Sequence, residues 1–262
     1  MSEVIIAWWS AGVTSAVATK LAIQEFGTKI KPVYFQIDSA HQDNKRFKED
    51  CENWYGMEIE VRQASRFKDQ FDVIEVKKYI NGPAGARCTV ELKKNVRHKV
   101  EKEFKYSGQI FGFEYSKREV NRAVRFKEQH PSTNPIFPLI EAKMTKPECL
   151  YLIEKANIKI PEMYQLGYSN NNCIGCVKGG IGYWNKIRVD FPDVFNRMSS
   201  LERKLNRHCL KEGYLDEIDS NRGHKQKIIM PDCGNFCDLE FEDLDHPRLN
   251  EIFEDPLLLR RL

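Results

Sequence analysis

The stretch "VIIAWWSAGVTSAVATKLA", residues 4–22, constrains the fold most, because an apolar run ends in small and hydroxyl residues before a second apolar run begins. Val4 to Trp9 are continuously apolar and rich in β-branched and aromatic side chains, which is typical of a strand buried on both faces. From Ala16 to Leu21 the apolar residues recur at helical spacing. The residues between them can present backbone N–H groups to an anion at the start of the helix, where the helix dipole favours negative charge. The stretch therefore predicts a strand–loop–helix unit that binds phosphate.

The rest of the first half continues this alternation. Further strands are predicted within residues 29–38, 57–64 and 108–114, and helices within 43–56, 67–80, 89–105 and 116–130. Strands that alternate with helices indicate βαβ units, a mostly parallel twisted sheet and helices on both of its faces. We therefore expect an α/β fold with about five strands.

The character of the sequence changes near His130, where prolines gather in "HPSTNPIFPL" and no long strand is predicted beyond. Thr145 and Glu148 have capping-box spacing and indicate a helix start. A loop rich in Gly and Asn follows, and a helical hairpin is expected over about residues 181–212. These features predict a phosphate-binding α/β domain over residues 1–130 and a helical region with a Cys-rich loop and tail over residues 131–262.

Composition and charge restrict the class of protein and its cellular location. With 41 Lys+Arg against 38 Asp+Glu, the net charge of +3 does not single out a nucleic-acid binder. No apolar run is long enough to span a membrane and no secretory leader is recognisable, so we expect no membrane association and a cytoplasmic location. In that reducing compartment, the 8 Cys favour metal-binding or redox-active thiols over disulfides.

The cysteines differ in their surroundings. Cys173 and Cys176 form a C-x-x-C motif in a loop without apolar periodicity, which suits two thiolates on one metal, a zinc half-site or a redox pair. Cys88 follows Arg87, whose charge would favour a thiolate. Cys51 and Cys149 lie in helix-like segments and are interpreted as small buried hydrophobes.

Several motifs, in the same order along the chain, resemble the PP-loop family of adenine-nucleotide α-hydrolase-like proteins. This family includes sulfonucleotide reductases, thiolating ATP pyrophosphatases and DNA phosphorothioation proteins. "SAGVTS", residues 10–15, resembles the family's S-G-G-x-D-S loop, with Ala11 in place of a glycine and Thr14 in place of the aspartate. "ARCTVELKK", "FGFEYSKREVNR" and "IPEMYQLGYSNNNCIGC" are similar to three motifs of the phosphoadenosine phosphosulfate reductase branch, although Glu114 stands where an arginine is common. The resemblance covers about residues 4–180.

The resemblance implies roles for individual residues. An adenine nucleotide, ATP or phosphoadenosine phosphosulfate, would be bound by Ser10, Gly12, Val13, Thr14, Ser15, Asp38, Lys93 and Arg122. An iron–sulfur cluster, expected as 4Fe-4S with zinc as the alternative, would be held by Cys88, Cys173, Cys176 and Cys237. Cys233 would either complete that ligand set or attack sulfur as a nucleophile, with Arg87 as a second catalytic residue. Mg²⁺ would offset the phosphate charge.

The leading hypothesis is an enzyme that uses ATP to adenylate an acceptor, with nucleic acid as one candidate, for thiolation. The alternatives are a sulfonucleotide reductase with Cys233 as nucleophile and a non-catalytic nucleotide sensor. Expected partners are a sulfur donor of the cysteine desulfurase or thioredoxin kind and a second copy of the chain. For nucleic acid, the basic residues near positions 77–99 and 118–125 would follow the backbone, with Tyr183 and Trp184 stacking on bases.

Overall fold

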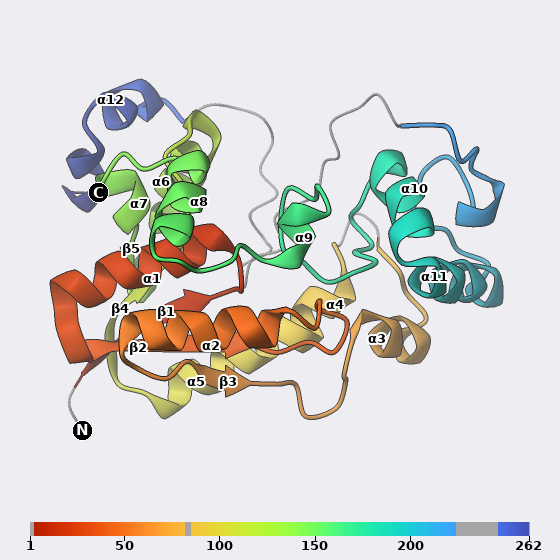
Figure 1. Ribbon diagram of the computed structural model, residues 1–262, viewed down its shortest axis with the longest axis horizontal. Coiled ribbons are helices and arrows are strands. Elements are labelled where there is room, and N and C mark those ends of the chain that lie inside the picture. The colour runs from red at the N-terminus through yellow and green to blue at the C-terminus, as the bar shows by residue number, and fades with distance from the viewer. Residues whose placement is uncertain (1–2, 82–84, 224–245, 262) are drawn as a thin grey trace.

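The computed structural model describes residues 3–81, 85–223 and 246–261 (Figure 1). Within these ranges the strands form one five-stranded sheet in the order β3-β2-β1-β4-β5, and every pairing is parallel. The strands are β1 (Val4–Trp9), β2 (Ile30–Phe35), β3 (Glu60–Arg62), β4 (Tyr106–Ile110) and β5 (Pro135–Ile136). The predicted α/β fold with a parallel sheet is therefore confirmed.

Strand β1 lies at the centre of the sheet, between β2 and β4. Ala7 is in register with Pro32 on one side and with Ile110 on the other. Because the chain moves outward from β1 first through β2 and β3 and later through β4 and β5, the strand order reverses here. In open parallel sheets a crevice forms at such a switch point, beyond the carboxyl ends of the strands.

Helices cover both faces of the sheet (Figure 1). Ile5, Ala7 and Trp9 of β1 face α1 (Val13–Phe26), α2 (Asn44–Tyr55) and α8 (Lys146–Lys155). Ile6 and Trp8 face α5 (Asn95–Glu103), α6 (Lys117–Gln129) and α12 (Leu249–Glu254). Since alternate residues of a strand point to opposite faces, the continuous apolar run of β1 serves both cores.

A separate apolar core lies away from the sheet. It joins α3 (Gln70–Lys77), α10 (Ile181–Asp190) and α11 (Pro192–Leu205) around buried side chains such as Trp184 and Met198. The predicted hairpin corresponds to α10 and α11. Residue 130 does not separate the cores, because β5, α7 (Pro138–Glu141) and α8 still pack with the sheet, whereas α3 packs with the later helices.

The remaining elements connect these layers. The predicted helix over residues 89–105 is divided into α4 (Arg87–Thr89), a π-helical segment (Val90–Lys94) and α5. The capping box is confirmed, since the N–H of Thr145 donates to Oε2 of Glu148 over 2.7 Å. The other short helices are α9 (Glu162–Gln165) and the 3₁₀ segments Gly27–Lys29, Pro131–Thr133, Leu215–Glu217 and Pro256–Arg261.

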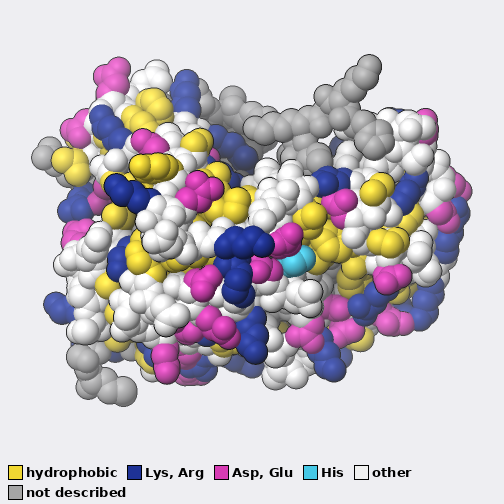
Figure 2. All heavy atoms as spheres, in the orientation of Figure 1, with side chains coloured by type: hydrophobic (Ala, Val, Ile, Leu, Met, Phe, Trp, Pro, Cys, Tyr) yellow, Lys and Arg dark blue, Asp and Glu magenta, His cyan; other side chains and the backbone are white. Residues whose placement is uncertain are grey.

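The surface charges are mixed. On the face seen in Figure 2, Lys and Arg side chains lie among Asp and Glu side chains. Within the basic region near positions 77–99, Lys77 pairs with Glu91 and Arg97 with Glu101. Across the described ranges, no helix combines the length and apolar character that crossing a membrane requires.

Candidate functional site

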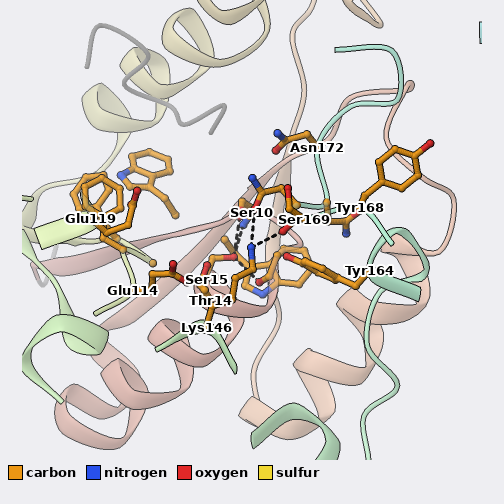
Figure 3. Close-up of a pocket in the computed structure, with 18 of the residues that line it drawn as sticks. Ser10, Thr14, Ser15, Glu114, Glu119, Lys146, Tyr164, Tyr168, Ser169 and Asn172 are labelled. Carbon is orange, nitrogen blue, oxygen red and sulfur yellow. Dashed lines mark hydrogen bonds between the residues drawn. The ribbon is translucent and has the colours of Figure 1, made fainter. Parts of the chain in front are cut away.

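A cavity of about 850 Å³ opens where the strand order reverses. We call it the large cavity (Figure 3). One wall is formed by residues 10–15, which connect β1 to α1 and include the first turn of α1; they are here called the phosphate loop. The other walls come from the segment after β4, the start of α8 and residues 167–173. Of the predicted nucleotide-binding residues, six line it: Ser10, Gly12, Thr14, Ser15, Lys93 and Arg122.

The phosphate loop is held in shape by its own hydroxyl groups. Oγ of Ser15 donates to the carbonyl of Gly12 over 2.9 Å and accepts from the N–H of Ser10 over 3.0 Å. The Ser10 and Ser15 hydroxyls lie 2.9 Å apart. Because the Ser15 hydrogen is used on Gly12, Ser10 is the donor in this pair. Both predicted serines therefore hold the loop in shape, which leaves the backbone amides as the groups available to an anion.

The start of α1 presents backbone amides of the kind that bind anions. Gly12 is the N-cap and no side chain caps this end. The N–H of Val13 donates to the Tyr164 hydroxyl over 3.4 Å. The amides of Thr14 and Ser15 belong to the first turn, where no intrahelical acceptor exists. Together with the helix dipole they make this end of α1 suited to phosphate.

Ala11 occupies a left-handed backbone conformation with φ of 60°. Its side chain is fully buried. Since this conformation is unfavourable for a residue with a Cβ, the turn stores strain that a glycine would avoid.

Lys146 brings a positive charge to the phosphate loop from α8. Its ammonium donates to the carbonyl of Ser169 and, over 2.7 Å, to Oδ1 of Asn170, and it lies 5.4 Å from the centre of the Tyr164 ring. Figure 3 shows it between the phosphate loop and Ser169. Lys146 was not predicted as a site residue, because the capping box of α8 indicates a helix start but not the packing of α8 against α1.

A buried chain of amides ties residues 167–173 to the phosphate loop. Nδ2 of Asn171 donates to the carbonyl of Ala11 over 2.8 Å and to Oδ1 of Asn44 over 2.7 Å. Nδ2 of Asn44 in turn donates to the Tyr34 hydroxyl over 3.3 Å. Burial raises the pKa of Tyr34, although the bond from Asn44 acts in the opposite direction, so this hydroxyl stays protonated at neutral pH. Asn171 was also missed, since three adjacent asparagines resemble an ordinary polar loop.

The wall after β4 combines aromatic and charged groups. The Arg122 guanidinium lies 4.5 Å from the centre of the Phe113 ring, and its Nη1 is 3.2 Å from Oε2 of Glu119. Glu114 and Arg118 line the same wall. Figure 3 shows Glu114 and Glu119 across the cavity from Tyr164.

Three predicted site residues lie elsewhere. Asp38 is exposed, accepts a hydrogen bond from Nε2 of Gln63 over 2.9 Å and does not line the cavity. Arg87 is exposed at the start of α4 and lines neither this cavity nor the smaller one described next. Val13 does not line the cavity, because its side chain is buried, and its backbone N–H donates to the Tyr164 hydroxyl.

A second cavity of about 20 Å³, the thiol cavity, adjoins the first. Cys88, Cys173 and Cys176 all line it, and Cys173 and Lys93 also line the large cavity. The loop of residues 173–176, here called the cysteine loop, is anchored by a bond of 2.8 Å from Nε2 of Gln70 to the carbonyl of Ile174. The three predicted thiols that the structure describes therefore share the wall of one cavity.

The donor type of these thiols suits a metal group, but their arrangement does not. Thiolates are the donors that iron–sulfur clusters and zinc prefer, so the donor type fits. In the ranges given above, no three or more His, Cys, Asp or Glu side chains are arranged closely enough to hold a metal ion. Cys233 and Cys237, the predicted nucleophile and fourth ligand, lie outside the described residues.

Two further predictions concern buried side chains. Cys51 and Cys149 are fully buried, and burial raises the pKa of each thiol to about 12, which confirms them as core residues. Tyr183 and Trp184 are each only 1% exposed. The prediction that they stack on nucleic-acid bases is therefore wrong, because both rings are enclosed by the helical core.

A family model described as phosphoadenosine phosphosulfate reductase domain matches residues 4–179. The matched segment begins at β1 and ends after the cysteine loop, so it contains the phosphate loop and the three thiols of the thiol cavity. No curated protein matches the chain in sequence.

Proposed function

The chain belongs to the phosphoadenosine phosphosulfate reductase domain family, and from this premise we propose that it is an enzyme that binds an adenine nucleotide in the large cavity and uses it in sulfur transfer. The observation that carries the proposal is the position of Cys173, which lines both the large cavity and the thiol cavity. A thiol at this shared wall lies next to the place where the nucleotide would react.

In the proposed binding mode, the phosphates rest against the first turn of α1. The amides of Thr14 and Ser15 donate to phosphate oxygens, and Lys146 and Lys93 supply positive charge from two other walls. Mg²⁺ would offset further phosphate charge. Glu114 and Glu119 are the carboxylates among the described lining residues, and Glu119 already pairs with Arg122.

The reaction that we favour has two steps. An oxygen of the acceptor attacks the α-phosphorus of ATP and pyrophosphate leaves, which gives an adenylated acceptor. A sulfur nucleophile at the thiol cavity then bonds to the acceptor as AMP leaves. Cations at the phosphate loop would stabilise the charge that develops on the departing pyrophosphate.

The donor type of Cys88, Cys173 and Cys176, which line one cavity, supports an iron–sulfur cluster with a fourth ligand from Cys233 or Cys237, or zinc as the alternative, although the described side chains would have to move closer together to hold it. Such a group would supply sulfur or electrons at the wall that the two cavities share. A sulfur-donor protein, a nucleic-acid acceptor and a homodimer remain predicted partners.

Sulfonucleotide reduction is the second candidate. It is favoured by Arg118 and Arg122, two guanidinium groups in the wall of the large cavity that suit sulfate or phosphate oxygens. In this reaction the nucleotide is the substrate and Cys233 would attack its sulfur.

Product analysis separates these functions. Pyrophosphate release from ATP in the presence of acceptor supports the first, and sulfite release from phosphoadenosine phosphosulfate with reduced thioredoxin supports the second. Nucleotide binding without either product would support the sensor hypothesis. If calorimetric titration with both nucleotides gave no binding, the whole proposal would fail.

Lys146→Gln tests the proposed site itself. Loss of a charge-assisted contact to phosphate should weaken ATP binding by about 10-fold or more. Lys155→Gln, at the other end of α8 beside Tyr151, is the matched control and should bind ATP like the wild type. Equal affinities for the two variants would contradict the placement of the phosphates.

A further inference from the structure

The Tyr183 hydroxyl forms hydrogen bonds to three backbone groups of the cysteine loop. It accepts hydrogen bonds from the N–H of Gly175 over 2.9 Å and from the N–H of Cys176 over 3.0 Å. It donates to the carbonyl of Cys173 over 3.3 Å. A phenol has one hydrogen to donate and two lone pairs to accept with, so all of its hydrogen-bonding capacity is used on this loop.

Close packing fixes the ring that carries this hydroxyl. A Cβ added at Gly179 would lie 2.0 Å from Cδ1 of Tyr183, so the ring rests directly against the backbone there. At Gly175, φ is 79° and an added Cβ would lie 2.7 Å from Val194. Both glycines are thus required by the close approach of the ring, the loop and α11. The hydroxyl is therefore held at a fixed point relative to the thiols.

This arrangement determines where the loop amides point. In C-x-x-C loops, backbone N–H groups are potential donors to the cysteine sulfurs, and such bonds tune the properties of thiolates and of the groups they hold. Here the amides of Gly175 and Cys176 donate to the Tyr183 hydroxyl. Cys173 and Cys176 meanwhile line the thiol cavity together with Cys88.

We propose that Tyr183 is a positioning residue for the thiols: its hydroxyl holds the cysteine loop from inside the helical core and directs Cys173 and Cys176 toward Cys88. The proposal rests on the proposed function of these thiols. It concerns the protein before any nucleotide or metal is bound, so it can be tested separately from that function.

Tyr183→Phe removes the hydroxyl and keeps the ring. Two buried amides then lose their acceptor, so local opening of the loop becomes easier. In the metal-free, reduced protein at fixed pH, the rate of Cys176 alkylation by iodoacetamide should rise by about 5-fold or more. Cys176 is 8% exposed and Cys149 is fully buried in the other core, so Cys149 serves as an internal reference for global unfolding.

Tyr168→Phe is the matched control. Its ring lies 5.9 Å from that of Tyr183, but its hydroxyl donates to Oδ2 of Asp190 over 2.9 Å and makes no bond to the cysteine loop. This control should leave the ratio of Cys176 to Cys149 alkylation at its wild-type value. An unchanged ratio in Tyr183→Phe, or equal increases in both tyrosine variants, would overturn the proposal.

Two further measurements test the role of Tyr183 without relying on the alkylation of one variant. In the wild type, hydrogen exchange at the amides of Gly175 and Cys176 should be slow, and exchange as fast as in an exposed loop would refute the assigned bonds. After reconstitution with iron and sulfide, Tyr183→Phe should shift the visible absorption relative to Tyr168→Phe, and identical spectra would count against a positioning role. Failure of the wild type to take up iron would remove the cluster hypothesis, while the alkylation and exchange results would still decide the role of Tyr183.

Discussion

Replacing Gly112 with alanine should weaken nucleotide binding by displacing the first turn of α1. Gly112 follows β4, and an added Cβ would lie 2.7 Å from both the amide nitrogen and Cα of Ser15. Ordinary contact begins at 3.4 Å, so the two backbones must separate by about 0.7 Å, the difference between these distances. Backbone atoms cannot rotate away as the end of a side chain can, so the phosphate loop itself must move.

The size of the effect follows from this displacement. Overpacking of this kind costs about 1–3 kcal/mol of folding stability. Hydrogen bonds from N–H to oxygen are best near 2.9 Å and are lost within a few tenths of an ångström beyond 3.2 Å. Loss of one bond to a charged phosphate should raise the dissociation constant for ATP by about 10-fold or more. Isothermal titration calorimetry measures this constant, and urea unfolding measures the stability.

Gly180→Ala is the comparison variant, because an added Cβ there meets nothing within 4 Å and φ is −80°. It should bind ATP as tightly as the wild type does. The reasoning would be refuted if Gly112→Ala were folded and bound ATP with wild-type affinity.

Three more predictions concern other parts of the molecule. Asn171→Ala should destabilise the protein by about 1–3 kcal/mol in urea unfolding and weaken ATP binding, because Asn44 and the phosphate loop lose a buried hydrogen-bond partner. Wild-type stability together with wild-type ATP affinity would contradict this prediction. Glu202 is 0% exposed and accepts hydrogen bonds from the N–H groups of residues 209 and 215. Glu202→Ala should therefore lower the free energy of unfolding by about 3 kcal/mol in the same assay. A loss below about 1 kcal/mol would argue against these bonds. The hydrogen bond from Arg46 lowers the pKa of Asp43 below its ordinary value of 3.8; this pair therefore stabilises the fold above pH 3.8, and the contribution is lost as pH falls through the lowered pKa. Asp43→Asn should be less stable than the wild type at pH 7 and lose less stability on acidification, and parallel pH profiles would disprove the linkage.

The parallel sheet was predictable because β1 and the helices carry strong local patterns, whereas the strand order was not predicted. The apolar run of β1 and the glycine after α2 are signals that act over a few residues. The interruption of the long basic helix by a π-helical segment was not predictable, because the sequence over residues 89–105 keeps helical spacing throughout. The core to which α3 belongs was equally hidden, since it depends on contacts with residues more than 100 positions later.

The candidate site was predictable where motifs carry it. Most of the phosphate loop lines the large cavity and the three described thiols line the thiol cavity, while their roles in binding remain predictions. Lys146 and Asn171 could not be identified, because the capping box and the motif that contain them do not reveal that each side chain reaches the cavity through tertiary packing. Asp38 shows the opposite limit: it matches a motif position, yet its side chain points to solvent and bonds to Gln63.

Elements from both halves of the chain contribute to each of these two cores, so the enzyme cannot be divided into two folded fragments. A fragment ending at residue 130 would leave α3 without the helices that shelter it, and would strip α8 from the sheet. A fragment beginning at residue 131 would carry the C-x-x-C pair but not Cys88, nor the strands on which α8 rests. Neither fragment should be soluble or bind nucleotide by itself, because the two halves form one folding unit.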